Sequence, residues 1–346
     1  MPTQTITPDD PLQLVGHVLD GTYRVDAVVG EGGFGIVYRA LHLQFDALVA
    51  VKCLKIPWTA KPEVREAFLA KFSEEAKLLL QLSKGTLGIV HSIASGALDT
   101  PAGIWAPYFV LEWLDGESME SVLGKRRAQG LRGCPLAEAI EWLDMPARAL
   151  AYAHTKRVAH RDIKPANLFV LRDEDGGSNP VPTIKVLDFG IAKAMEQDQR
   201  AAVKGFTTLG YSTFSPKYAA SEQVDVRLGS TGPWSDVYSF ALVMVEVLTD
   251  RQAVDSEDAV SLMLEVLNPL VRPTPRSRGA FVAQAVEDVF AKALQVNPSD
   301  RFQSMGEFWR ALAVATQGDS VSISAPSTGS GGCRGGTDVR YRKRCG

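Results

Sequence analysis

One short run in the middle of the chain combines three side-chain types that phosphoryl transfer needs. Within residues 160–167, which read HRDIKPAN, Asp162 can orient and deprotonate an attacking hydroxyl, Lys164 can neutralise a transferring phosphate, and Asn167 can hold a metal ion. Asp188 follows later, in the triplet DFG, and can bind the Mg²⁺ that bridges nucleotide phosphates. Either motif alone would arise by chance, so the interpretation depends on what accompanies them.

A glycine-rich segment, GEGGFGIV at residues 30–37, is a candidate phosphate-binding loop. Glycine lets backbone N–H groups approach phosphates without a Cβ in the way. Taken alone, the segment fits a plain hairpin turn about equally well. It does not match a dinucleotide-binding fingerprint, because a strand rather than a helix follows it. The candidate nucleotide-binding residues of this loop are Gly30, Glu31, Gly32, Gly33, Phe34 and Gly35.

Lys52 ends an apolar, strand-like run, VAVK at residues 49–52. A lysine on such a strand is costly to bury unless it meets anions, and phosphate oxygens together with a carboxylate would satisfy it. In the helical pattern of residues 68–82, Glu75 shares the apolar stripe whereas Glu74 faces solvent. We therefore expect Glu75 to point inward and to pair with Lys52.

The elements that must position these residues form two groups. Alternating, valine-rich segments between residues 23 and 55 and the apolar run 107–114 indicate strands. The pieces NLFVL and IKVLDFG, which flank an exposed acidic loop, also indicate strands. Helical periodicity dominates the second half, in residues 136–155, 236–250, 280–294 and 304–315. The pattern predicts a small β-rich lobe followed by a larger helical lobe.

The composition excludes several classes of protein. With 37 basic and 40 acidic residues the net charge is −3, which does not indicate a nucleic-acid binder. The four cysteines form no CxxC pair, so neither a zinc site nor a disulfide framework is predicted. The first residues lack the pattern of a secretory signal, and no apolar run is long enough to span a bilayer. We expect a cytoplasmic protein with no membrane segment in this chain.

All four motifs, in this order, resemble the eukaryotic-like (Hanks-type) Ser/Thr protein kinases, and most closely their bacterial members. The resemblance covers about residues 21–315 and implies an α+β, bilobal protein-kinase fold. It divides the chain into a flexible lead-in (1–20), an N-lobe with one αC helix (21–114), a mainly helical C-lobe (115–315) and a low-complexity basic tail (316–346). It also implies ATP and Mg²⁺, with Asn167 and Asp188 as metal ligands.

The resemblance assigns further roles to residues outside the catalytic motifs. It makes Leu111 the gatekeeper of the adenine pocket, beside the backbone groups of Glu112 and Leu114. The residues that would sandwich the adenine ring are Val37, Ala50 and Phe169. It implies that Asp236 braces the catalytic loop and that Glu222, at the end of the activation segment, pairs with a buried Arg301. Three departures from the family pattern, Ser221, Ala241 and Phe214-Ser215, put in doubt the shape of the substrate-docking surface more than phosphoryl transfer.

Substrate class and regulation follow from the same resemblance. Lys164 and the hydroxyl of Ser215 favour Ser/Thr substrates on proteins. Arg161 beside Asp162 is typical of kinases in which a phosphorylated loop residue orders the activation segment. This predicts autophosphorylation, with a transient homodimer left open, although solvated loop hydroxyls are favoured for any single candidate. The candidates are Thr207, Thr208, Ser212 and Thr213.

Two alternatives to an active protein kinase stay open at this point. A non-catalytic scaffold would carry a damaged lysine or aspartate motif, whereas Lys52, Asp162 and Asp188 are all intact. A small-molecule phosphotransferase of related fold would lack the long activation segment and the Glu222–Arg301 pair. The basic tail is either an interaction segment or, as its composition favours, a solvated end.

Overall fold

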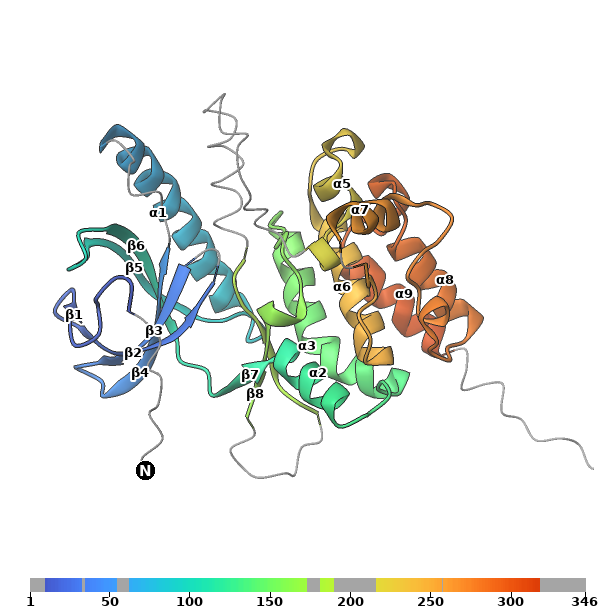
Figure 1. Cartoon of the computed structure of the whole chain (residues 1–346), viewed down its shortest axis with the longest axis horizontal. Helices are drawn as coiled ribbons and strands as arrows, with labels where there is room; N and C mark the ends of the chain where they lie inside the picture. The colour runs from blue at the N-terminus through green and yellow to red at the C-terminus, as the bar shows by residue number, and fades with distance from the viewer. Residues whose placement is uncertain are drawn as a thin grey trace, which may run out of the picture.

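The computed structural model describes residues 10–32, 35–54, 62–172, 181–189, 216–256 and 258–317. Figure 1 shows a sheet with one long helix at one end of the molecule and a group of helices at the other end. This is the bilobal α+β arrangement that the sequence predicts. Several predicted features lie outside the described residues: the loop residues Gly33 and Phe34, the candidate phosphorylation sites, Phe214-Ser215, and the basic tail from residue 318 onward. The first two residues assigned to the tail, 316 and 317, end helix α9.

The N-lobe is built on a six-stranded antiparallel sheet in the order β1-β2-β3-β4-β6-β5. Helix α1, Pro62–Gly85, packs on one face of it, and its Phe72 ring lies 4.5 Å from the ring of Phe109 on β6. Strand β5 lies in a stretch for which the sequence predicts no strand. The strands are β1 Val18–Leu19, β2 Tyr23–Glu31, β3 Gly35–His42, β4 Ala47–Leu54, β5 Ser92–Asp99 and β6 Trp105–Glu112.

Residues 10–17 form a strap over the face of this sheet that is turned away from α1, and they lead into the edge strand β1. Leu14 is fully buried there, within a cluster made of strap and sheet residues. The carboxylate of Asp10 accepts a hydrogen bond of 2.8 Å from the hydroxyl of Tyr38 on β3. Apolar contacts and this hydrogen bond thus join residues 10–20, which the sequence analysis assigns to a flexible lead-in (1–20), to the sheet.

The C-lobe is organised around helix α6, whose residues 235–248 are all buried. A helix that is buried on all sides belongs at the centre of a helical bundle, and α3 and α9 flank it (Figure 1). Helix α3 covers the same residues as the predicted helix, and α2 and α7 are additional. The helices are α2 Met119–Ala128, α3 Leu136–Thr155, α5 Ser221–Val224, α6 Pro233–Thr249, α7 Ala259–Leu267, α8 Gln284–Ala293 and α9 Met305–Gln317.

A three-stranded antiparallel sheet lies between the two groups of elements, in the order β7-β8-β9. Its strands are β7 Gly116–Ser118, β8 Leu168–Leu171 and β9 Ile184–Val186. Strands β8 and β9 correspond to the two predicted strand-like pieces. They connect the catalytic loop, which ends at Asn167, to Asp188. Among the described residues, no helix has both the length and the apolar character that crossing a bilayer requires.

Candidate active site

The side chains of strand β4 alternate between the two faces of the sheet. Core residues lie on one face and the candidate functional residues on the other. Val49, Val51 and Cys53 are buried under the strap, so Ala50 and Lys52 point to the opposite face, toward the C-lobe. The Nζ atom of Lys52 lies 2.5 Å from Oδ1 of Asp188, and the Lys52 side chain is 14% exposed. Lys52 therefore links the N-lobe sheet to the segment that follows β9.

Helix α1 brings a glutamate to the inner side of the N-lobe. Glu75 is half-buried, next to buried Ala76, whereas Glu74 is exposed, which is the orientation that the apolar stripe predicts. Lys52 forms an ion pair with Asp188. Pairing of Glu75 with Lys52 stays a prediction.

The catalytic-loop residues converge on one carboxylate. Lys164 Nζ lies 3.1 Å from Asp162 Oδ2. The amide of Asn167 donates to the backbone oxygen of Asp162 at 2.7 Å and to its Oδ2 at 3.1 Å. The short 3₁₀ turn Pro165–Asn167 positions this amide at the start of β8. The loop thus presents a carboxylate, an ammonium and an amide within hydrogen-bonding distance of one another.

Asp236, at the start of α6, holds the backbone of the catalytic loop in place. Its carboxylate accepts hydrogen bonds from the N–H groups of His160 and Arg161, both at 2.7 Å, and from Nε2 of His154 at 2.9 Å. Burial alone would raise the pKa of Asp236, but the hydrogen bonds and the nearby histidines outweigh it, so this pKa is lowered. Arg161 has a φ of 65°, a strained conformation that these bonds hold in place.

His160 connects the loop to the segment before Asp188. Its Nδ1 accepts from the N–H of Asp162 at 3.2 Å, so the proton resides on Nε2, which donates to the backbone oxygen of Leu187 at 2.6 Å. Burial lowers the pKa of His160 and keeps the ring neutral. The ring of Phe189 packs 4.9 Å from it. The two candidate metal-binding segments are therefore held together by a neutral histidine.

Asp188 occupies a charged environment at the junction of the lobes. Burial opposes ionisation of its carboxyl, but the charge and hydrogen bond of Lys52, with a smaller contribution from the charge of Lys164, lower its pKa. Its φ of 50° lies in the left-handed region. An ionised carboxylate at this position is suited to binding a hard cation.

Three of the residues expected to contact adenine lie on neighbouring strands of the N-lobe sheet. Val37 on β3 pairs in register with Lys52, and Ala50 on β4 pairs with Leu111 on β6. Leu111 is 9% exposed. Phe169 lies on β8, and Leu114 is half-buried in the connection between the lobes. The structure thus brings these side chains to the junction of the two lobes.

The glycine-rich segment forms the connection between β2 and β3. The N–H of Gly32 donates to the backbone oxygen of Gly35 at 2.9 Å, which closes the turn. A Cβ at Gly35 would clash with the backbone oxygen of Cys53 on β4, so a side chain cannot be accommodated there without moving the strand. Gly30 and Glu31 end strand β2.

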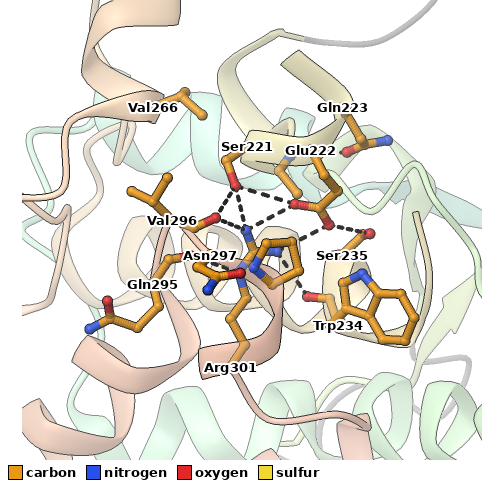
Figure 2. Close-up of polar contacts among 12 residues, drawn as sticks. Ser221, Glu222, Gln223, Trp234, Ser235, Val266, Gln295, Val296, Asn297 and Arg301 are labelled. Atoms are coloured by element: carbon orange, nitrogen blue, oxygen red, sulfur yellow. Dashed lines mark hydrogen bonds and ion pairs between the residues drawn. The ribbon is translucent and has the colours of Figure 1, made fainter. Parts of the chain in front are cut away.

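Glu222 and Arg301 form a fully buried ion pair in the C-lobe, as Figure 2 shows. The guanidinium donates to both carboxylate oxygens, Nη1 to Oε1 at 3.1 Å and Nη2 to Oε2 at 2.9 Å. It also donates to the backbone oxygens of Gln295 and Val296 and to the hydroxyl of Ser221. Ser221, one of the departures from the family pattern, thus takes part in the same network.

Two residues with roles at the site were not identified from the sequence. Lys185 on β9 binds Glu112 at the end of β6, with 2.5 Å between Nζ and Oε1. His154 on α3 connects Asp236 to the first turn of α9, because its Nδ1 accepts from the N–H of Met305 at 3.0 Å. Lys185 carries the signal that identified Lys52: a lysine between apolar residues of a short strand.

The donor set at the junction suits Mg²⁺. Over the part of the chain that the structure describes, no group of three or more His, Cys, Asp or Glu side chains could hold a metal ion. Mg²⁺ does not need such a group, because it is bound through one or two carboxylates together with substrate phosphates and water. Asp188 and Asn167 provide oxygen ligands of this kind.

The chain matches the model of the protein kinase domain over residues 23–309. It is 32% identical over 324 residues to serine/threonine-protein kinase Pkn1 of Myxococcus xanthus, covering 93% of this chain and 42% of Pkn1. It is 29% identical over 305 residues to serine/threonine-protein kinase PknA of Mycobacterium tuberculosis, covering 88% and 63%. The chain thus spans less than two thirds of the length of these relatives.

The fold agrees with these matches. The crystal structure of the Mycobacterium tuberculosis PknI kinase domain superposes with a TM-score of 0.62 at 23% identity, over 87% of this chain and 99% of that domain. The residues matched by the family model, 23–309, include the segments that carry Lys52, Asp162 and Asp188. The chain belongs to the protein kinase domain family.

Proposed function

We propose that this protein is a serine/threonine protein kinase that transfers the γ-phosphoryl group of ATP to hydroxyl groups of protein substrates. The observation that carries the proposal is the convergence of Lys164 and Asn167 on the carboxylate of Asp162. The similarity to the serine/threonine-protein kinases Pkn1 and PknA supports the Ser/Thr class, and so does Lys164 two residues after Asp162.

The reaction needs a base, a neutralising cation and a fixed nucleotide. The carboxylate of Asp162 takes the proton of the substrate hydroxyl while the hydroxyl oxygen forms a bond to the γ-phosphorus of ATP. The bond between that phosphorus and the bridging oxygen then breaks, and ADP leaves. The ammonium of Lys164, already within 3.1 Å of Asp162, neutralises charge on the transferring group. Asn167 and Asp188 would hold Mg²⁺, which when bound neutralises phosphate charge.

Nucleotide binding is divided between the lobes. Lys52, supported by Glu75, would hold the α- and β-phosphates below the glycine-rich loop. The adenine ring would lie between Val37 and Ala50 above and Phe169 below, where the structure brings apolar side chains to the junction. Leu111 limits the depth of this pocket, and the backbone groups of Glu112 and Leu114 would bind the edge of the ring.

Protein substrates, a cytoplasmic location and autophosphorylation belong to the same proposal. The candidate acceptors in the activation segment are those of the sequence analysis, with a transient homodimer as the route. Phosphopeptide mapping of the protein after incubation with Mg²⁺ and ATP tests this part. A map without modification between residues 190 and 220 would refute autophosphorylation of the segment.

The decisive assay incubates purified protein with Mg²⁺ and γ-labelled ATP, alone and with a generic protein substrate. Asp162→Asn should reduce the transfer rate by about 10²–10⁴-fold, because it removes the base. Lys52→Met should abolish labelling. The control Arg172→Met removes an ion pair to Asp115 in which the two side chains are 70% and 57% exposed, and it should be labelled like the wild type. Phosphoamino-acid analysis should find label on serine or threonine. A wild type that binds ATP without transferring label to itself or to substrate would refute the kinase assignment.

A further inference from the structure

Strand β9 of the C-lobe is bound to the N-lobe at two of its residues, Lys185 and Val186. The N–H of Val186 donates to the backbone oxygen of Gly88 at 2.8 Å, and the N–H of Val90 donates to the backbone oxygen of Val186 at 3.0 Å. Next to this bridge, Lys185 reaches Glu112 on β6. The path of β9 is therefore set by the N-lobe as well as by its neighbour β8.

Lys185 faces the junction because of the strand's alternation. Ile184 and Val186, on either side of it, are completely buried in the core. Lys185 pairs in register with Phe169 on β8, so both side chains lie on the face of the small sheet that meets the N-lobe. The Lys185 side chain is only 14% exposed, and its ammonium needs an anionic partner there.

Glu112 supplies that partner and is itself held on two sides. Its Oε1 accepts from Lys185 Nζ at 2.5 Å and from the N–H of His91 at 2.7 Å. Its own N–H donates to the backbone oxygen of His91 at 3.0 Å. These contacts fix the peptide at the end of β6, where the proposed function places the edge of the adenine ring. We call Lys185, Glu112 and the backbone of His91 the interlobe latch.

Two ion pairs therefore join the lobes, and their C-lobe members, Lys185 and Asp188, lie within four residues of sequence. The lobe that contributes the positive charge differs between the two pairs. At Asp188 the C-lobe contributes the acid and the N-lobe contributes Lys52, whereas in the interlobe latch the C-lobe contributes the base, Lys185. The proposed function gives Lys52 to ATP phosphates and Asp188 to Mg²⁺, so their direct contact is exchanged for nucleotide contacts. The interlobe latch has no phosphate or metal to bind and keeps its contact.

We propose that Lys185 is a positioning residue for the nucleotide: through the interlobe latch it holds the adenine-binding end of β6 against the C-lobe floor formed by Phe169. This inference rests on the proposed function. Losing the ammonium would leave Glu112 without its charged partner and free the end of β6. The predicted consequence is weaker nucleotide binding with a nearly unchanged chemical step, because Asp236 separately holds the backbone of His160 and Arg161, in the loop that carries Asp162.

The test measures ADP affinity by calorimetric titration and, with a generic substrate, kcat and KM for ATP. Lys185→Met should weaken ADP binding and raise KM for ATP about tenfold, as expected for one charge-assisted hydrogen bond, while kcat stays within about twofold. Lys185→Arg keeps the charge and should restore both constants to within about twofold of wild type. Arg172→Met removes an exposed C-lobe cation and should change neither.

The outcomes separate the two proposals. Unchanged ADP affinity in Lys185→Met refutes the positioning role. A fall in kcat as large as the loss of ADP affinity refutes it too, if Lys185→Arg does not restore kcat. If Lys185→Met does not fold, Glu112→Gln is tested instead, because it removes the charge and keeps an acceptor for the His91 N–H. Unchanged ADP affinity in Glu112→Gln also refutes the positioning role. If the wild type binds ADP but transfers no label, the kinase function is refuted, and the ADP affinity of Lys185→Met still tests the interlobe latch. If the wild type binds no nucleotide, both proposals are refuted.

Discussion

Replacing Arg301 with methionine would remove every donor that its guanidinium supplies inside the C-lobe. The change leaves the Glu222 carboxylate buried with only serine hydroxyls as partners, and the backbone oxygens of Gln295 and Val296 lose a donor. The aromatic face of Tyr238, 4.6 Å from the guanidinium carbon, loses its cation as well. Because the Glu222 and Arg301 side chains are completely inaccessible to solvent, no water can replace the lost contacts.

Breaking a buried pair by removing one partner costs about 3–5 kcal/mol, a large part of the total stability of about 5–15 kcal/mol of a typical protein. With a urea dependence of about 3 kcal/mol per M, the unfolding midpoint of Arg301→Met should fall by about 1–1.7 M. Urea titrations followed by fluorescence measure this midpoint.

The matched control is Arg227→Met, which removes an ion pair to Asp225 in which the arginine is 86% exposed. Its midpoint should equal that of the wild type. A double variant, Arg301→Met with Glu222→Leu, should recover much of the loss because no buried charge is left unpaired. If Arg301→Met unfolded at the same urea concentration as Arg227→Met, the argument from buried charge would be refuted.

Three further predictions concern the N-lobe and the junction. Leu14→Ala should lower the free energy of unfolding by about 2–5 kcal/mol, measured by urea titration, because it creates a cavity under the strap. Gly35→Ala should weaken ADP binding, measured by calorimetry, because its Cβ would clash with a backbone oxygen of β4, whereas Gly32→Ala has open space and should clash with nothing. The lowered pKa of Asp188 stabilises the folded state above the ordinary aspartate pKa of 3.8, and this stabilisation is lost as pH falls through the lower folded pKa. Lys52→Met should therefore flatten the acid limb of the stability profile, recorded as melting temperature between about pH 5 and 2.

The fold and the chemistry were predictable where short-range pattern determines structure. Helix α3 follows from its apolar periodicity, and the grouping of Asp162, Lys164 and Asn167 follows from their spacing in one loop. Confirmation of the kinase fold shows that motif order constrains three-dimensional arrangement even at low sequence identity. The site roles of individual residues remain predictions that the proposed experiments test.

Elements that depend on long-range contacts escaped prediction. Strand β5 reads SIASGALD, a weak strand sequence, and it forms because it pairs with the strongly apolar β6. The strap carries its leucines without a regular period, and it is held by the hydrogen bond from Tyr38, 28 residues away from Asp10. The contact of Lys185 with Glu112 spans 73 residues. No local pattern identifies such partners.

The strap has a consequence for where the folded unit begins. The family match starts at Tyr23, after the strap, so a protein shortened to that point would keep every catalytic motif. It would expose the apolar sheet face that Leu14 covers and leave the hydroxyl of buried Tyr38 without its acceptor. Exposed apolar faces of this kind promote self-association. The smallest unit that keeps this sheet face covered should therefore begin no later than Asp10, upstream of Tyr23, where the family match starts.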